Sequence, residues 1–186
     1  MASSGKIRAH LTAALDDQRL VRVACGKGWR TYDGYVVARS RDWCALQSVA
    51  AAQRTGLVLF RVADVRKVGT PHHDKELARR ALEHEGAWPP AMPALLDLED
   101  VRSVLFTAGS LVPVIAFAAE QYARDFFVGT VFRITKKYLD TMEILPNGQW
   151  NEDVQSWFLD DITRVVLHDP YVDILNAVAG PMPTAT

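Results

Sequence analysis

The segment ADVRKV at residues 63–68 is matched 97 positions later by DDITRV at residues 160–165. Each segment reads aspartate, a β-branched residue, any residue, a basic residue and valine. The apolar residues of the following stretch also match at this offset: Leu77, Ala78, Ala81 and Leu82 correspond to Ile174, Leu175, Val178 and Ala179. Self-similarity at a fixed offset indicates a repeated structural unit.

Further matches lie upstream, at slightly smaller offsets. Gly34-Tyr35-Val36 corresponds to Gly129-Thr130-Val131 at an offset of 95. We align Leu46 with Met142 and Val49 with Leu145 at 96, and Ile7, Ala14 and Leu20-Val21 with Leu98, Leu105 and Leu111-Val112 at 91. The offset changes only between segments, where turns tolerate insertions. The sequence therefore predicts a duplicated domain.

Hydrophobic periodicity and turn residues give both copies the same plan of helix, five short strands and helix. In the first copy we expect helices over 5–17 and 75–85 and strands over 20–25, 32–39, 43–49, 57–62 and 65–68. In the second we expect a helix over 97–108 that ends at Gly109, strands over 112–118, 126–134, 138–145, 155–160 and 162–167, and a helix over 170–179. The predicted class is mainly β with flanking helices (α+β). The predicted domains are a basic first copy (1–86), a Pro-rich linker (87–93) and an acidic second copy (94–182).

Gly34 with Leu46, and Gly129 with Met142, resemble the first motif of the Sm-like version of the small SH3-type β-barrel. This resemblance implies two tandem five-stranded barrels, each with an N-terminal and a C-terminal helix. The family's second motif, apolar–basic–Gly between strands four and five, is replaced by Ala63-Asp64 and Asp160-Asp161. Its RNA-contacting residues are therefore not carried over. The stretch from strand four to the helix also resembles uncharacterised bacterial accessory or immunity-type proteins.

Composition indicates a soluble globular protein, with 49% hydrophobic and 23% charged residues. No apolar run reaches the roughly 18 residues of a membrane span, and the N-terminus lacks the apolar core of a secretory signal. Cys25 and Cys44 lie in predicted strands, where buried thiols are common, so we expect no disulfide. We expect a cytoplasmic protein that does not bind a membrane.

Charge divides sharply between the copies. Residues 1–88 hold 15 Lys and Arg and 9 Asp and Glu, a net charge of +6, whereas residues 89–186 hold 6 and 13, a net charge of −7. Such polarity concerns partners and association rather than fold. It makes head-to-tail self-association possible.

Candidate catalytic and metal-binding groups are all better explained by structure. His72-His73-Asp74 with His84 is the nearest approach to a metal cluster, but Asp74 and Asp169 are expected to cap helices. Asp64 and Asp161 occupy equivalent corners, where carboxylates bond backbone N–H groups. The sequence lacks a nucleophile elbow and a phosphate-binding glycine loop. We therefore expect no enzyme activity, catalytic residue, metal or cofactor.

The second copy contains an aromatic residue among acidic ones, a pattern that suits a protein interface. The predicted partner-binding residues, expected to be exposed, are Trp150, Glu152, Asp153, Asp140 and Glu143. The leading hypothesis is a non-catalytic protein-interaction module, of which an inhibitor or immunity protein against a bacterial toxin is one concrete form.

The alternative is an Sm-like protein that binds single-stranded RNA. Positive charge interleaved with aromatic residues is typical of single-strand binding. The candidate residues lie on the first strands and turns of the first copy: Arg22, Arg30, Arg39, Arg41 and Trp43.

Overall fold

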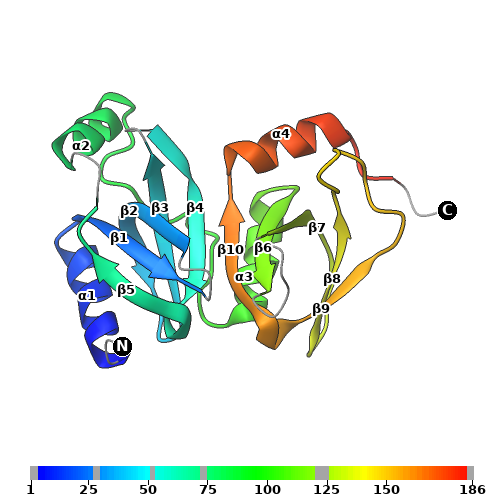
Figure 1. Ribbon diagram of the computed structural model, residues 1–186, viewed down its shortest axis with the longest axis horizontal. Coiled ribbons are helices and arrows are strands. Elements are labelled where there is room, and N and C mark those ends of the chain that lie inside the picture. The colour runs from blue at the N-terminus through cyan, green and yellow to red at the C-terminus, as the bar shows by residue number, and fades with distance from the viewer. Residues whose placement is uncertain (1–3, 27–29, 51–52, 72–74, 120–125, 184–186) are drawn as a thin grey trace.

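The computed structural model describes residues 4–26, 30–50, 53–71, 75–119 and 126–183. Figure 1 shows two groups of strands joined side by side, with helices around them. The first group comprises α1 (Ser4–Asp16), β1 (Leu20–Cys25), β2 (Arg30–Arg39), β3 (Trp43–Ala50), β4 (Gln53–Arg61), the 3-10 turn η1 (Val62–Asp64), β5 (Val65–Gly69) and α2 (Lys75–His84). The second comprises α3 (Val101–Leu111), β6 (Ile115–Ala119), β7 (Phe127–Ile134), β8 (Tyr138–Glu143), β9 (Gln155–Phe158), η2 (Leu159–Asp161), β10 (Ile162–Leu167) and α4 (Pro170–Ala179).

All of these strands belong to one open antiparallel sheet, in the order β5-β1-β2-β3-β4-β10-β6-β7-β8-β9. The predicted α+β class is confirmed, but the expected pair of separate closed barrels is not what the structure shows. β4 pairs with β10 through Leu59 opposite Val165 and Val58 opposite Val166. These four side chains are buried. An uncovered apolar edge would be unfavourable in either half, and the pairing removes it.

The two halves of the sheet nevertheless share one strand order, 5-1-2-3-4 in each half's own numbering. A 3-10 turn precedes the last strand in both halves, Val62–Asp64 and Leu159–Asp161, at the predicted offset of 97. The first helices also correspond, because α1 contacts β2, β5 and η1 whereas α3 contacts β7, β10 and η2. The sequence repeat is thus a repeat of topology within one continuous sheet.

Gly34 and Gly129 explain why this repeat carries a glycine in its second strand. A Cβ atom on Gly34 would collide with the carbonyl oxygen of Gln47, and one on Gly129 would lie 2.5 Å from that of Met142. Gly34 pairs with Ser48 and Gly129 with Glu143. The predicted alignment of Leu46 with Met142 is therefore one residue out of register.

The start of the second half also differs from the prediction. Leu111, which we aligned with a strand residue, belongs to α3, and the helix continues through Gly109. A Cβ at Gly109 would lie 2.9 Å from Cγ2 of Val131 on β7. This glycine therefore permits close packing of α3 on the sheet and does not end the helix.

The core follows the two faces of the sheet. Along β4, Leu57 and Leu59 join a buried cluster with α3, while Val58 and Phe60 join a second cluster with α1 and α4. Side chains of successive strand residues point to opposite faces, so one strand feeds both clusters. None of the helices in the described ranges is long and apolar enough to cross a membrane.

Candidate functional site

The predicted acidic patch of the second half is not an exposed cluster. Asp140 and Glu143 are buried, which is contrary to expectation, and only Glu152 and Asp153 are fully exposed. Trp150 is half-buried, and its indole N–H donates to the carbonyl oxygen of Gly180 at 3.2 Å. Of the four acidic residues predicted to bind a partner, only Glu152 and Asp153 are therefore exposed.

Glu143 faces inward because it lies on the core side of β8. One of its carboxylate oxygens accepts a hydrogen bond from the indole N–H of Trp157 at 2.9 Å. The same oxygen lies 3.5 Å from the hydroxyl of Thr141. Burial of a carboxylate requires such partners, so Glu143 contributes to the interior of the second half.

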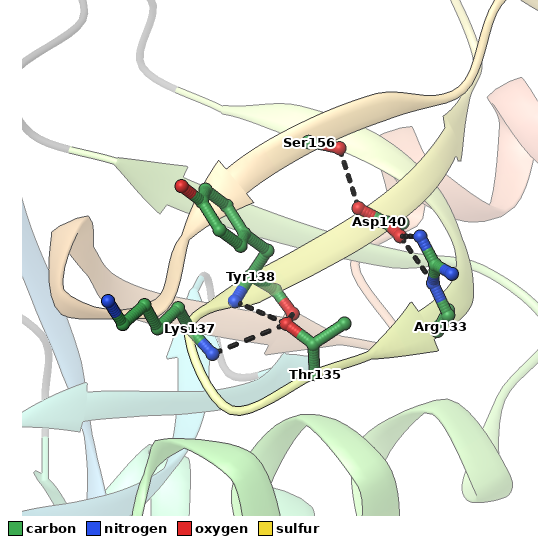
Figure 2. Close-up of polar contacts among 6 residues, drawn as sticks. All are labelled: Arg133, Thr135, Lys137, Tyr138, Asp140 and Ser156. Carbon is green, nitrogen blue, oxygen red and sulfur yellow. Dashed lines mark hydrogen bonds and ion pairs between the residues drawn. The ribbon is translucent and has the colours of Figure 1, made fainter.

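Asp140 is the centre of a polar row that crosses three strands (Figure 2). Ser156 on β9 donates its hydroxyl to one carboxylate oxygen at 2.6 Å, and Arg133 on β7 donates Nε to the other at 2.7 Å. The hydrogen bond from Ser156, followed by the hydrogen bond and charge of Arg133, lowers the pKa of Asp140 against the opposing effect of burial. The row ties the short strand β9 to β8 and holds the exposed guanidinium of Arg133 in place.

The turn that joins β7 to β8 is closed by Thr135. Its hydroxyl accepts from the backbone N–H of Tyr138 at 2.8 Å and of Lys137 at 3.3 Å (Figure 2). Ser40 makes the corresponding bonds in the first half, accepting from the backbone N–H of Trp43 at 3.0 Å. Tyr138 is thus the structural counterpart of Trp43.

These two counterparts differ in burial. Trp43 is 2% exposed and belongs to the cluster that includes α3, whereas Tyr138 is 38% exposed. Tyr138 packs on Phe158, itself 49% exposed, with ring centroids 4.7 Å apart. The second half covers Trp43, but no described residue covers the Tyr138–Phe158 pair in that way. An aromatic pair therefore stands exposed at the outer strand of the sheet.

The backbone of β9 also faces outward at defined positions. Leu159 donates its N–H to the carbonyl of Lys137 at 2.9 Å, and Phe158 lies opposite Tyr138. Hydrogen-bonded and non-hydrogen-bonded pairs alternate along an antiparallel ladder, so the N–H and C=O groups of Ser156 and the N–H of Phe158 point away from β8. The C=O of Phe158, the N-cap of η2, belongs to the 3-10 turn. In the ranges that the structure describes, β9 pairs only with β8. We call this outer side of β9, with Tyr138 beside it, the β9 edge.

The basic residues predicted to bind nucleic acid are not gathered around an exposed aromatic residue. Arg22 forms a two-pronged ion pair with Asp33, at 2.6 and 2.8 Å. The indole of Trp43 is buried beneath Arg61, so it offers no stacking surface. The remaining candidates are dispersed: Arg39 donates to the carbonyl of Ser40, Arg30 lies over the ring of Phe126, and Arg41 is exposed.

A buried guanidinium that the sequence analysis missed lies where the two halves meet. Arg164 on β10 is 4% exposed, lies over the rings of Phe126 and Tyr32, and approaches the sulfur of Cys25 at 3.5 Å. Its Nε atom and the hydroxyl of Tyr32 have no hydrogen-bond partner. No local sequence signal marks Arg164 as buried, because its neighbours Cys25, Tyr32 and Phe126 are all distant from it in the sequence.

The groups considered for catalysis or metal binding lie apart. His72, His73 and Asp74 fall outside the described residues, whereas His84 ends α2 and His168 precedes α4. Asp169 caps α4 as predicted, and Asp64 and Asp161 end the two 3-10 turns. Within the described ranges, no three or more His, Cys, Asp or Glu side chains are placed to hold a metal ion.

The two cysteines are both buried, as expected, and no disulfide joins them. Cys44 lies in the apolar interior, where burial raises the pKa of its thiol to about 12.

Comparison with protein-family models, with curated proteins and with solved structures found no match to this chain.

Proposed function

We propose that this protein acts by binding another protein and that the β9 edge is its docking surface. The observation that carries this proposal is the exposed pair of Tyr138 and Phe158 beside outward-facing backbone groups of Ser156 and Phe158. An extended segment of a partner can add to such an edge through main-chain hydrogen bonds. Aromatic residues are the side chains that most often dominate interface energetics.

The composition of β9 supports the same use. Proteins usually protect an open sheet edge by keeping the strand very short or by placing charged residues or proline on it. β9 is short, but its four residues, Gln-Ser-Trp-Phe, include neither a charged residue nor proline. The polar row from Ser156 through Asp140 to Arg133 fixes the strand in place, which lowers the entropy cost of binding there.

The charge around the edge is mixed. Glu152 and Asp153 precede β9 and Asp160 follows it in η2, all three exposed, while Lys136 and Lys137 are exposed in the turn beside Tyr138. The acidic residues at the two ends of β9 suit basic groups of a partner, such as a nuclease toxin, that reach those ends. The inhibitor or immunity role draws on the family resemblance and remains a proposal within this broader function.

A photo-crosslinking amino acid at position 158 tests the proposal in cells. Ile174 on α4 provides the control position because it is 62% exposed and α4 lies at the other end of the second half from the join of β9 and η2 (Figure 1). We expect a defined protein adduct from position 158 and none from position 174. Crosslinks to RNA at position 158 would favour the RNA-binding alternative, and equal protein labelling at both positions would contradict a specific docking edge.

A further inference from the structure

We propose that copies of this protein associate head to tail, with the β5 edge of one chain extending the sheet at the β9 edge of the next. This inference rests on the proposed function and names a second copy of the chain as the occupant of the docking surface. The contact would repeat, between chains, the pairing that joins the two halves within one chain.

The strand order supplies the first argument. β4 and β9 hold equivalent positions in the two halves, as do β10 and β5. β10 covers β4 within the chain, whereas, among the described residues, β9 and β5 each pair on one side only. Every chain therefore has two open edges, β9 and β5, that are equivalent to the strands β4 and β10 paired inside the chain.

The hydrogen-bond register agrees with this equivalence. Val62 donates its N–H to the carbonyl of Asp42 at 2.9 Å, as Leu159 does to that of Lys137. The backbone of Leu59 therefore faces away from β3, toward Val165 on β10. At the offset of 97, Ser156 on β9 corresponds to Leu59 on β4. Val68 on β5 corresponds in the same way to Val165 on β10. Val68 of a second copy would thus pair with Ser156.

The exposed rings supply the third argument. Trp43 is buried because the second half lies against the outer face of the first. A second copy at the β9 edge would lie in the same position relative to Tyr138, and it would cover part of Phe158, whose counterpart Arg61 is half-buried. Burial of this aromatic surface is favourable because apolar surface leaves water.

Charge distinguishes the two edges and sets the direction of contact. Arg66 and Lys67 on β5 are exposed. Glu152, Asp153 and Asp160 are exposed at the two ends of β9, and Lys136 and Lys137 are exposed in the neighbouring turn. Arg66 and Lys67 of a second copy can approach the three carboxylates, whereas two β5 edges would bring only cations together, so the contact is heterologous.

The proposed contact should be weaker than the one inside the chain. The central pairing buries Leu57, Val58, Leu59 and Phe60, but β9 offers Gln155 and Ser156, and β5 ends in Gly69. We therefore expect reversible association that depends on concentration and weakens as salt screens the charges.

The test is sedimentation of the full chain over a range of concentrations, at low and high salt. We expect the average mass to rise with concentration beyond that of a dimer, because each added chain brings a new open edge. Phe158→Glu should block the β9 edge, and the pair Arg66→Glu with Lys67→Glu should block the β5 edge. Each should weaken association on the order of tenfold or more, whereas Ile174→Glu on the exposed face of α4 should leave it unchanged. Circular dichroism checks that all three variants are folded.

Mixing the two edge-blocked variants is the decisive measurement. Each retains the edge that the other lacks, so the mixture should form a one-to-one dimer and nothing larger. A wild-type chain that stays monomeric at every concentration, or blocked variants that associate like wild type, would overturn the inference. Crosslinking of position 158 to a different protein in cells would leave the proposed function standing even then.

Discussion

The guanidinium of Arg164 on β10 lies 3.5 Å from the sulfur of Cys25 on β1, so a charged side chain joins positions 139 residues apart. The aromatic rings of Tyr32 and Phe126 flank it. Arg164 forms no ion pair with a described carboxylate. Withdrawal of a guanidinium from water costs several kcal/mol unless an opposite charge compensates it, and two cation–π contacts recover only about 1–2 kcal/mol each.

Replacement of Arg164 by methionine should therefore leave the protein as stable as wild type, or more stable. The thioether chain fills similar volume without a desolvation cost. Urea unfolding at pH 7 measures the effect, and Arg164→Glu provides the contrast because it buries an unpaired negative charge. A loss of more than about 3 kcal/mol in Arg164→Met would show that the guanidinium is compensated in the folded protein.

Tyr32→Phe should change the alkaline stability of the protein. Burial raises the pKa of Tyr32 to about 12, against a lowering effect of Arg164. Since the unfolded phenol ionises near pH 10 and the folded one does not, wild type should lose stability as pH rises from about 10 to 12. The loss attributable to Tyr32 should be on the order of 2 kcal/mol.

Urea titrations of both proteins at pH 7 and pH 11.5 isolate this contribution, because other groups titrate alike in each. At pH 7, Tyr32→Phe should cost nothing, since the phenol hydroxyl is buried without a partner. An equal loss in both proteins between the two pH values would argue against a protonated, buried phenol.

Asp140→Asn should destabilise the second half in a way that depends on acid. The pKa of Asp140 is lowered in the folded state, so its carboxylate contributes stability above the unfolded value near pH 4 and loses it as pH falls through the folded value. We expect a cost of about 1–2 kcal/mol at pH 7, because Arg133 is largely exposed and screened. The difference between variant and wild type should shrink from pH 4 to pH 2, and a constant difference would be inconsistent with this role.

Gly34→Ala and Gly129→Ala should each destabilise the protein by about 1–3 kcal/mol, the usual cost of inserting a methyl group into a filled space. In both cases the new methyl group would meet a backbone carbonyl of the neighbouring strand. Gly5→Ala in α1 is the matched control, because no atom lies within 4 Å of the added methyl group. It should gain about 0.5–1 kcal/mol from the better helix propensity of alanine. Thermal unfolding of the three variants compares them directly.

The sequence allowed the α+β class and the duplicated succession of helix, five strands and helix to be predicted, because turn residues and apolar periodicity are local signals. Asp64 and Asp161 mark the clearest example, since the two 3-10 turns keep their predicted offset. Continuity of the sheet could not be predicted in this way, because it depends on β4 meeting β10, which lies about 100 residues away.

The exposure of site residues was harder to predict. Asp140 and Glu143 suggested an acidic surface, but their partners Ser156 and Trp157 lie on another strand and draw them inward. Tyr138 and Phe158 were not singled out, although the repeat offered a signal. Tyr138 lies 95 residues after Trp43. The exposure of Tyr138 becomes significant only once the structure shows that the second half buries Trp43.

The shared pairing of β4 with β10 makes the two halves mechanically inseparable. Cutting the chain in the proline-rich linker would leave two fragments, each with a bare apolar strand where its neighbour had been. Such fragments should aggregate rather than fold alone, and the intact chain should melt as one calorimetric unit. Each half of the repeat thus depends on the other for the cover of its outer strand.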